Sequence, residues 1–469
     1  MAKNKVFLLL LDGVGLRNFA YSNFIAEGEK KNNDVVFWNK THFPVESLGF
    51  KELKIENQKI HPVTDTLKKA KKDVNLNVFI QRTGDKVYNS YKFKFSYKTL
   101  NAAVKSMLAR LLIFTLSSER GLQLLDKYIN YFERKTKYYT HCQAVLQSEK
   151  PSVVFCTSQR HVQSIAPLLA AKDLGIPTVS FIFSWDNLPK ATMVVETDYY
   201  LVWSEHMKAE LLYYHPNIKE NQILVTGTPQ FEIHFEKESL LSREAFFEAH
   251  ALDKNKKYIC FSGDDVTTSP DDPKYLEDLA LAITRLNKKN HNLGIVFRRC
   301  PVDFSSRYDA VLARYKDIIV AIDPIWKPFS SHWNTILPTK EDGVLFSNIA
   351  EHCEMVVNLG STTLFDFVSH NKPCGYFRYN QFEQNNPKWD IFRCYKFVHF
   401  RSMHSAESVI WLDGPADIDS KIENVINNQH NINNDSAKKW FEKINQHPVD
   451  KASERIWESI EKITNGSLC

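Results

Sequence analysis

Short runs of hydrophobic residues alternate along the chain with longer amphipathic stretches. Runs with the length of buried strands lie at residues 6–11, 35–38, 76–80, 152–156, 178–183, 199–203, 222–226, 258–262, 294–298, 318–322, 355–358 and 374–377. Apolar residues recur with helical spacing at residues 162–173, 205–214, 273–289, 342–352 and 363–370. Strands that alternate with helices in this way predict parallel sheets covered by helices on both faces.

The strand–helix alternation starts a second time after Gly227-Thr228-Pro229, which interrupts it. We therefore predict two doubly wound α/β domains, residues 1–235 and 236–430. Helices are expected to follow over residues 431–469, with apolar contacts supplied by Trp440, Ile444 and Trp457.

Composition and charge exclude several classes of protein. The 469 residues carry 60 basic and 55 acidic side chains, and this mild net charge of +5 argues against a nucleic-acid binder. The eight cysteines are widely spaced without a C-x-x-C pair, so we expect reduced thiols and no metal site. The apolar run 6–11 is too short for a signal peptide, and no run approaches the ~18 residues of a membrane span. We therefore expect a cytoplasmic protein.

Residues 92–116 interrupt the first series of strands with a mixture of apolar and basic side chains, the latter being Lys92, Lys94, Lys98, Lys105 and Arg110. The pattern fits a helix that faces the core and exposes a basic side. It also fits a surface that meets a membrane or a lipid-linked substrate. Periodicity alone does not separate the two interpretations.

Two loops that follow predicted strands in the first half carry acid–base candidates. Asp12 comes directly after the first strand, and the neighbouring Gly13 and Gly15 allow a substrate to approach the backbone closely. Asp12 is therefore our first candidate for a general base, with Arg17 as a phosphate contact, although a plain strand-to-helix turn also fits. His161 is the second candidate, because imidazole is the side chain that ordinarily exchanges a proton near neutral pH, although a helix-capping cluster explains its neighbours equally.

The loop at residues 184–190 places an aromatic face beside directional polar groups, a combination that suits a sugar site. Trp185, Asn187 and Lys190 are expected to bind the acceptor, and Asp186 is the third candidate base. An Asx turn supported by a packed tryptophan is the alternative.

The second half contains a strand followed at once by Gly360-Ser361-Thr362-Thr363 and a helix, which predicts a phosphate cradle. Asp366, one turn later, could accept hydrogen bonds from ribose hydroxyls. At the ends of two other strands, Arg298 could neutralise a diphosphate, and Gly263 and Asp264 are expected near the same donor. An acidic pair formed by Asp264 and Asp265 could hold a metal, but other ligand types are missing nearby, so we expect none.

These motifs resemble those of GT-B glycosyltransferases and CDP-glycerol glycerophosphotransferases. The resemblance rests on Ser-Trp-Asp-Asn-Leu (184–188), Leu-Val-Trp-Ser-Glu (201–205), Val-Thr-Gly-Thr-Pro-Gln-Phe (225–231) and the segment from Gly360 to Pro373. The chain is similar, more distantly, to non-hydrolysing UDP-N-acetylglucosamine 2-epimerases, which carry Ser-Gly-Gly-x-x-Glu where this chain has Gly-Ser-Thr-Thr-x-x-Asp.

The resemblance implies two facing Rossmann-like domains with a cleft between them, an acceptor site in the first and a nucleotide-sugar donor of UDP, GDP or CDP type in the second. It implies metal-independent transfer of a sugar to a glycan, lipid-linked or protein acceptor in surface polysaccharide or glycoconjugate synthesis. A CDP-glycerol-type polyol-phosphate transferase and a nucleotide-sugar 2-epimerase are the alternatives. No cofactor and no nucleic-acid partner is expected, and residues 92–116 allow contact with the cytoplasmic face of the inner membrane.

Overall fold

The computed structural model describes residues 4–329, 335–429 and 431–467. Contacts divide the chain into two compact units. Unit 1 holds the residues up to Pro229 together with those from Ile444 onward, and unit 2 holds Gln230–Lys443. The sequence pattern places the boundaries at 235/236 and 430/431, with the last helices together in a third segment. In the structure these helices are divided, because α16 (Asn431–Ile444) lies almost wholly in unit 2 and α17 (Ala452–Thr464) lies in unit 1. Unit 2 is thus inserted into the chain of unit 1.

Unit 1 is built around a seven-stranded sheet of order β3-β2-β1-β4-β5-β6-β7, parallel throughout. Its strands are β1 (Asn4–Leu10), β2 (Asn33–Asn39), β3 (Lys51–Lys54), β4 (Val153–Cys156), β5 (Thr178–Phe181), β6 (Tyr199–Val202) and β7 (Ile223–Val225). The central strands are almost wholly buried, as expected for a parallel sheet covered on both faces. The chain reverses its direction of winding between β1 and β4, which is the topological switch point of such a sheet.

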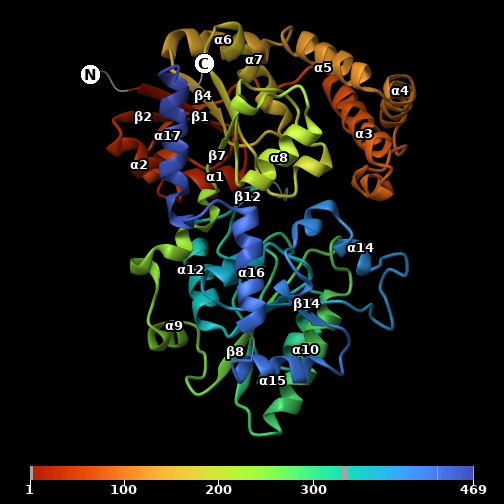
Figure 1. The fold of residues 1–469 in the computed structure, drawn as a ribbon, viewed down its shortest axis with the longest axis vertical. Helices are drawn as coiled ribbons and strands as arrows, with labels where there is room; N and C mark the ends of the chain where they lie inside the picture. Colours follow the sequence, from red (N-terminus) through yellow and green to blue (C-terminus); the bar gives the residue numbers. More distant parts are fainter. Residues whose placement is uncertain (1–3, 330–334, 430, 468–469) are drawn as a thin grey trace. The chain divides into compact units, whose positions relative to one another are not determined.

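Nine α-helices belong to the described part of unit 1: α1 (Gly13–Ala20), α2 (Phe24–Lys30), α3 (Thr64–Thr83), α4 (Leu100–Leu116), α5 (Glu119–Glu133), α6 (Lys137–Glu149), α7 (Ile165–Asp173), α8 (Glu205–Tyr214) and α17 (Ala452–Thr464). Figure 1 shows α3, α4 and α5 together at one side of this unit, with α4 outermost.

The C-terminal helix α17 completes unit 1. The Trp457 ring stacks on Phe24 of α2 with 4.7 Å between ring centroids, and its Nε1 donates a 2.6 Å hydrogen bond to the Phe24 carbonyl. A Cβ atom on Gly28 would lie 2.3 Å from the indole, so glycine is what allows this close packing. The last residues of the chain therefore fill part of the core of its first domain.

Unit 2 is built around a second parallel sheet, of order β10-β9-β8-β13-β14-β15, with its switch point between β8 and β13. The strands are β8 (Lys257–Ser262), β9 (Leu293–Arg298), β10 (Ile319–Ala321), β13 (Met355–Asn358), β14 (Cys374–Phe377) and β15 (Ile410–Leu412), with β11 (Lys327–Pro328) and β12 (Ile336–Leu337) pairing separately. The helices are α9 (Arg243–Ala249), α10 (Asp272–Asn287), α11 (Asp309–Arg314), α12 (Lys340–His352), α13 (Thr363–Ser369), α14 (Phe392–Tyr395), α15 (Ile418–Ile426) and α16 (Asn431–Ile444).

These two doubly wound sheets confirm the predicted α/β class. The strand predicted at residues 76–80 is wrong, because these residues belong to the twenty-residue helix α3. Val74, Leu76 and Val78 alternate with asparagine and so mimic a strand, but these residues lie within one continuous helix and are buried together with the asparagine and aspartate beside Val74. The edge strands β3 and β15 were not predicted, because β3 is mostly polar and β15 is only three residues long.

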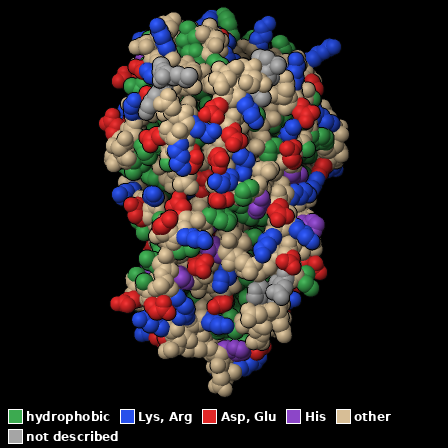
Figure 2. Space-filling model, turned by 60° about the vertical axis from the view of Figure 1, so that its left-hand side comes forward, with side chains coloured by type: hydrophobic (Ala, Val, Ile, Leu, Met, Phe, Trp, Pro, Cys, Tyr) green, Lys and Arg blue, Asp and Glu red, His purple; other side chains and the backbone are tan. Residues whose placement is uncertain are grey.

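The surface is mixed in charge, in keeping with the small net charge. Figure 2 shows basic and acidic side chains interspersed over one face, and neither sign dominates it. The seven cysteines among the described residues are all free thiols, as expected, and Cys469 lies outside these residues. No helix within the described ranges is both long and apolar enough to cross a membrane.

Candidate functional site

The three predicted catalytic residues follow neighbouring strands of unit 1. Asp12 comes after β1, His161 after β4 and Asp186 after β5, and β4 lies between the other two in the sheet. Because these strands are parallel, the three loops share the carboxyl edge of the sheet. Open α/β sheets bind ligands at this edge, beside the switch point. The edge is the candidate site of unit 1.

Asp12 and His161 form a carboxylate–imidazole pair, with 3.2 Å between Asp12 Oδ2 and His161 Nε2. The other oxygen, Oδ1, accepts a 2.8 Å hydrogen bond from the Gly15 amide and so caps α1. Burial raises the pKa of Asp12, but the interactions with His161 and the Gly15 amide outweigh burial and hold the pKa below its ordinary value. An ionised Asp12 favours the proton of neutral His161 on Nε2, which leaves Nδ1 as the basic nitrogen.

The glycines beside Asp12 shape the packing of α1. A Cβ atom on Gly15 would lie 2.7 Å from the Thr157 hydroxyl, so this glycine permits contact between α1 and the loop after β4. Gly13 begins α1, and Arg17 donates from Nε to the Asn18 side chain at 3.2 Å. The cavity described below has none of these residues in its lining.

The loop at residues 184–190 is held together by its own polar side chains. Asp186 accepts a 2.7 Å hydrogen bond from Asn187 and forms an ion pair with Lys190. Asn187 is buried and in turn accepts a 3.3 Å hydrogen bond from Gln159. Trp185 is also buried. Its ring therefore supports the loop from inside, and Asp186, Asn187 and Lys190 are the predicted residues that reach the cavity beside it.

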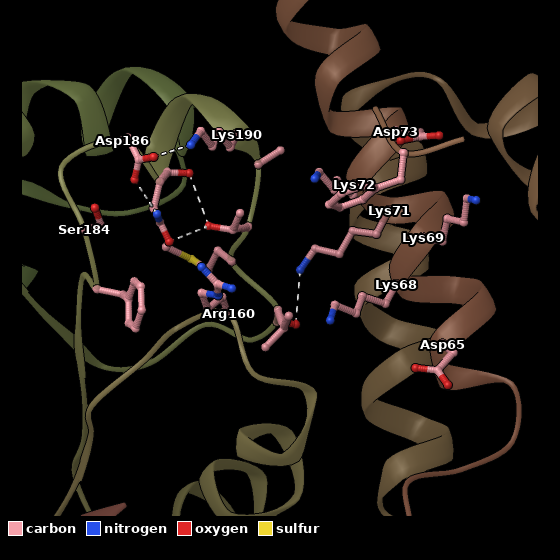
Figure 3. A pocket seen from close by; sticks show the side chains of 17 residues that line it. Asp65, Lys68, Lys69, Lys71, Lys72, Asp73, Arg160, Ser184, Asp186 and Lys190 are labelled. Carbon is pink, nitrogen blue, oxygen red and sulfur yellow. Dashed lines mark hydrogen bonds and ion pairs between the residues drawn. The ribbon is translucent and has the colours of Figure 1, made fainter. Parts of the chain in front are cut away.

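A cavity of about 630 Å³ lies between this loop and α3. Figure 3 shows Asp186, Lys190 and Arg160 on one side and the lysines of α3 on the other. Lys68, Lys71 and Lys72 extend from α3 towards the opposite loop, whereas Lys69 points away from it. Because Arg160 directly precedes His161, the cavity adjoins the loop that carries the carboxylate–imidazole pair.

The lysines of α3 were missed from the sequence. Their signal is the run Lys68-Lys69-Ala70-Lys71-Lys72, which on a helix ordinarily indicates a solvated face. The pattern of apolar residues did not reveal the helix that carries them either, because residues 76–80 of this helix were expected to form a strand. The helix turns this run towards the cavity, and Lys71 is itself buried, bonded to the Val194 carbonyl and paired with Asp126.

In unit 2, the predicted phosphate loop follows β13 at the switch point of the second sheet. Gly360 has a positive φ of 62°, which favours glycine. Ser361 donates its amide to Asn358 Oδ1 at 3.0 Å, and Thr363 donates its amide to the Ser361 hydroxyl at 3.3 Å. Thr362 is the N-cap residue of the seven-residue helix α13. The loop therefore occupies the expected place but uses part of its hydrogen-bonding capacity internally.

Asp366, predicted to contact ribose, begins a buried chain of polar groups. Its Oδ1 lies 2.9 Å from His234 Nε2, His234 Nδ1 lies 2.9 Å from His370 Nε2, and His370 Nδ1 lies 2.7 Å from Glu351. Burial and the neighbouring His234 lower the pKa of His370. One carboxylate oxygen of Asp366 is therefore committed to the interior of unit 2.

Arg298, predicted to neutralise a diphosphate, forms a buried ion pair with Asp342. Its Nη2 lies 2.8 and 2.9 Å from the two carboxylate oxygens, and both side chains are about nine-tenths buried. Asp342 also accepts hydrogen bonds from the Ile325 amide and the Trp326 indole. Nη1 of Arg298 is buried and has no hydrogen-bond partner among the described residues. Arg298 thus supports the fold around β9 and retains one unused donor group.

Gly263 and Asp264 follow β8 at the other side of this switch point. A Cβ atom on Gly263 would lie 3.0 Å from the Tyr308 hydroxyl, so the backbone packs tightly there. Burial and the nearby Asp272 raise the pKa of Asp264 well above its ordinary value. Asp264 therefore lies beside the strand that precedes the predicted phosphate loop, in surroundings that disfavour its ionised form.

No protein-family model matches the chain, and a search of curated proteins also finds no match. Solved structures are nevertheless similar over nearly the whole chain. The UDP-GlcNAc 2-epimerase from Neisseria meningitidis bound to UDP-GlcNAc has a TM-score of 0.55 at 14% identity, covering 98% of this chain and 99% of that one. The S. aureus MnaA–UDP co-structure gives 0.54 at 14% identity, with 98% and 97% covered. A glycosyltransferase from Rickettsia africae ESF-5 gives 0.52 at 10% identity, with 99% of each chain covered.

The fold is of the GT-B type. This confirms the fold that the motifs imply. At 10–14% identity this likeness establishes the GT-B fold.

Proposed function

We propose that this GT-B protein is a glycosyltransferase that moves a sugar from a nucleotide-sugar donor to a separate acceptor. The observation that carries the proposal is the cavity of about 630 Å³ in unit 1, lined by the loop at 184–194 and by α3. A transferase requires a site for a second substrate, and a cavity of this volume falls in the usual range for small-molecule sites. We assign the donor to the Gly360–Thr363 loop at the switch point of unit 2.

The carboxylate–imidazole pair suits the proton transfer that an inverting reaction requires. His161 Nδ1 would take the proton of an acceptor hydroxyl while that oxygen bonds to the anomeric carbon. The bond from that carbon to the diphosphate oxygen breaks, and the nucleoside diphosphate leaves with the electron pair. Asp12 would orient the ring and stabilise the protonated imidazole. We therefore place His161 as the base and Asp12 as its positioning residue, which reverses the order expected from sequence.

The fold neighbours supply a second candidate. Two of them are described as a UDP-GlcNAc 2-epimerase bound to UDP-GlcNAc and as a UDP co-structure. Both descriptions support a nucleotide-sugar ligand here. An epimerase would convert its nucleotide sugar without any acceptor, so the two functions differ in a measurable requirement.

Donor binding is the first experiment. A thermal-shift screen of UDP-, GDP- and CDP-sugars and CDP-glycerol should find a stabilising ligand, because a ligand at 100 times its Kd adds about 2.7 kcal/mol of stability. Release of nucleoside diphosphate and the fate of the sugar are then followed with and without candidate acceptors. Turnover that requires an acceptor supports a transferase, whereas a new sugar isomer formed from the donor alone would indicate an epimerase.

The base assignment is tested by single-turnover rates at saturating donor. His161→Ala should lower the rate about 10²–10⁴-fold. His291→Ala is the matched control, because His291 also pairs with a carboxylate, Glu423 at 3.0 Å, but lies at the amino end of β9. A loss below tenfold for His161→Ala would remove it as the base.

A further inference from the structure

We propose that the unit 1 cavity binds a phosphate or diphosphate group of the acceptor. This inference rests on the proposed function, because it names the chemical class of the second substrate. The lining contains six cationic side chains and three carboxylates. The cations are Lys68, Lys69, Lys71, Lys72, Arg160 and Lys190.

The positive charge is only partly neutralised within the protein. Lys190 pairs with Asp186 and Lys71 with Asp126. Lys68, Lys72 and Arg160 have no carboxylate within the 4 Å of an ion pair among the described residues. Three cations that converge on one cavity without a carboxylate partner form a site for an anion that carries more than one negative charge.

Two of these cations, Lys72 and Arg160, are held in place by aromatic rings. Lys72 Nζ lies 3.9 Å above the Phe93 ring centroid, and the Arg160 guanidinium lies 4.8 Å from that of Phe183. Both rings belong to the cavity lining. Cation–π contacts position the charges while leaving their N–H groups available to a ligand. The same rings offer apolar faces on which a sugar could rest beside its phosphate.

The lowered pKa of Lys72 agrees with the close grouping of these cations. Burial, together with the charges of Lys190, Lys68 and Arg160, lowers the pKa of Lys72 to about 8 against the opposing effect of Asp73. A bound phosphate would supply the missing negative charge and raise this pKa again. Anion binding should therefore weaken as the pH rises through 8, where Lys72 loses its proton.

The experiment measures binding by calorimetry at constant ionic strength, with inorganic phosphate, pyrophosphate, glucose 1-phosphate and glucose as probes. We expect the phosphorylated probes to bind and glucose to bind at least tenfold more weakly. Lys72→Gln and Arg160→Gln should each weaken phosphate binding at least tenfold. Lys137→Gln is the matched control in unit 1, because Lys137 is an exposed lysine of α6 that does not line the cavity. Circular dichroism establishes that each variant is folded.

Measuring nucleotide binding by the same variants distinguishes a failure of this proposal from a failure of the proposed function. If Lys72→Gln loses phosphate binding but keeps nucleotide binding, both proposals stand. If the variant loses nucleotide binding to the same degree, the cavity is a donor site and the acceptor assignment is overturned. Unchanged phosphate affinity in both Lys72→Gln and Arg160→Gln overturns the anion site alone. A phosphorylated lipid presented in detergent, compared with glucose 1-phosphate, distinguishes a lipid-linked from a water-soluble acceptor.

A second inference follows independently from the outer face of α4. An apolar stripe runs along this helix at positions three or four residues apart. Its members are exposed by 83% at Leu100, 56% at Val104, 66% at Met107, 59% at Leu111 and 87% at Phe114. The opposite side, with Leu112, Ile113 and Leu116, packs against the core of unit 1. The helix is therefore apolar on two sides, and the described residues cover only the inner one.

The charges around this stripe identify its partner. No aspartate or glutamate occurs from residue 86 to residue 118, whereas Lys86, Lys92, Lys94, Lys98, Lys105 and Arg110 all do. Apolar side chains flanked only by cations match an anionic lipid bilayer, with the helix lying in the plane of the interface. We infer that α4 docks unit 1 onto such a bilayer.

Co-sedimentation with vesicles tests this docking. The protein should bind vesicles containing about 30% phosphatidylglycerol and bind pure phosphatidylcholine more weakly, because each cation near an anionic surface strengthens binding about fivefold. Replacing Leu111 and Phe114 by Glu should abolish binding. A control double variant carries Glu at Val266 and Leu281, which are exposed in unit 2 by 57% and 41%. Equal binding of both double variants, or a dimer in solution that the first variant dissolves, would overturn the inference.

Discussion

Replacing Arg298 should destabilise unit 2 rather than merely weaken a ligand. In Arg298→Met, Asp342 remains buried and loses its cationic partner while keeping only its hydrogen bonds to Ile325 and Trp326. Breaking a buried ion pair from one side costs about 3–5 kcal/mol. For a domain of this size, 1 kcal/mol shifts the Tm by about 2–4 °C. The unfolding transition of unit 2 should therefore fall by about 6–20 °C.

A matched variant supplies the control. Arg285 also pairs with one carboxylate, since its Nε and Nη2 lie 2.9 and 3.1 Å from the oxygens of Asp419, but its side chain is 43% exposed. Arg285→Met should cost no more than about 1 kcal/mol. Differential scanning calorimetry compares the two variants. Adding Asp342→Asn to Arg298→Met should restore part of the lost stability, because it removes the unpaired charge. A Tm for Arg298→Met within 2 °C of that for Arg285→Met would refute the reasoning.

Three further variants test other features. Asp12→Asn should lower the single-turnover rate at least tenfold, because an amide no longer fixes the tautomer of His161, and a smaller loss would contradict the positioning role. Gly28→Ala should cost about 1–3 kcal/mol in urea unfolding, since its Cβ would lie 2.3 Å from Trp457, and an unchanged midpoint would show that the indole has room to move. In the wild type, phosphate affinity should fall between pH 7 and pH 9, because Lys72, whose pKa is about 8, loses its proton over this range. In Lys72→Gln the fall in affinity should be smaller. A fall as large as that of the wild type would show that another group is responsible.

The sequence predicts the layout of the sheets well, because fully buried parallel strands produce short apolar runs that are hard to mistake. It fails at residues 76–80, where an accidental alternation of apolar and polar residues lies on a long helix. It also fails at β3, a four-residue edge strand with two exposed ends. The local hydrophobic pattern therefore predicts strands that are buried on both faces. It fails for segments whose secondary structure depends on tertiary packing.

For the candidate site, the sequence predicts where residues lie in the fold but not which side chains they contact. Asp12, His161 and Asp186 could be placed at one edge, because parallel strand order brings their loops together. Pairing between side chains far apart in sequence could not be predicted. The partner of Arg298 is 44 residues away, and that of Asp366 is 132 residues away. Both were expected to face a ligand, and each uses part of its side chain to bind a protein group.

The insertion of unit 2 into unit 1 separates the order of synthesis from the order of folding. A ribosome completes residues 230–443 before it makes the segment that supplies Trp457 to the first domain. During that interval unit 1 presents Phe24 and the groove beside Gly28 without their cover. The nascent chain therefore carries an unfinished first domain while the second can already close, and the first domain is completed only when α17 has emerged.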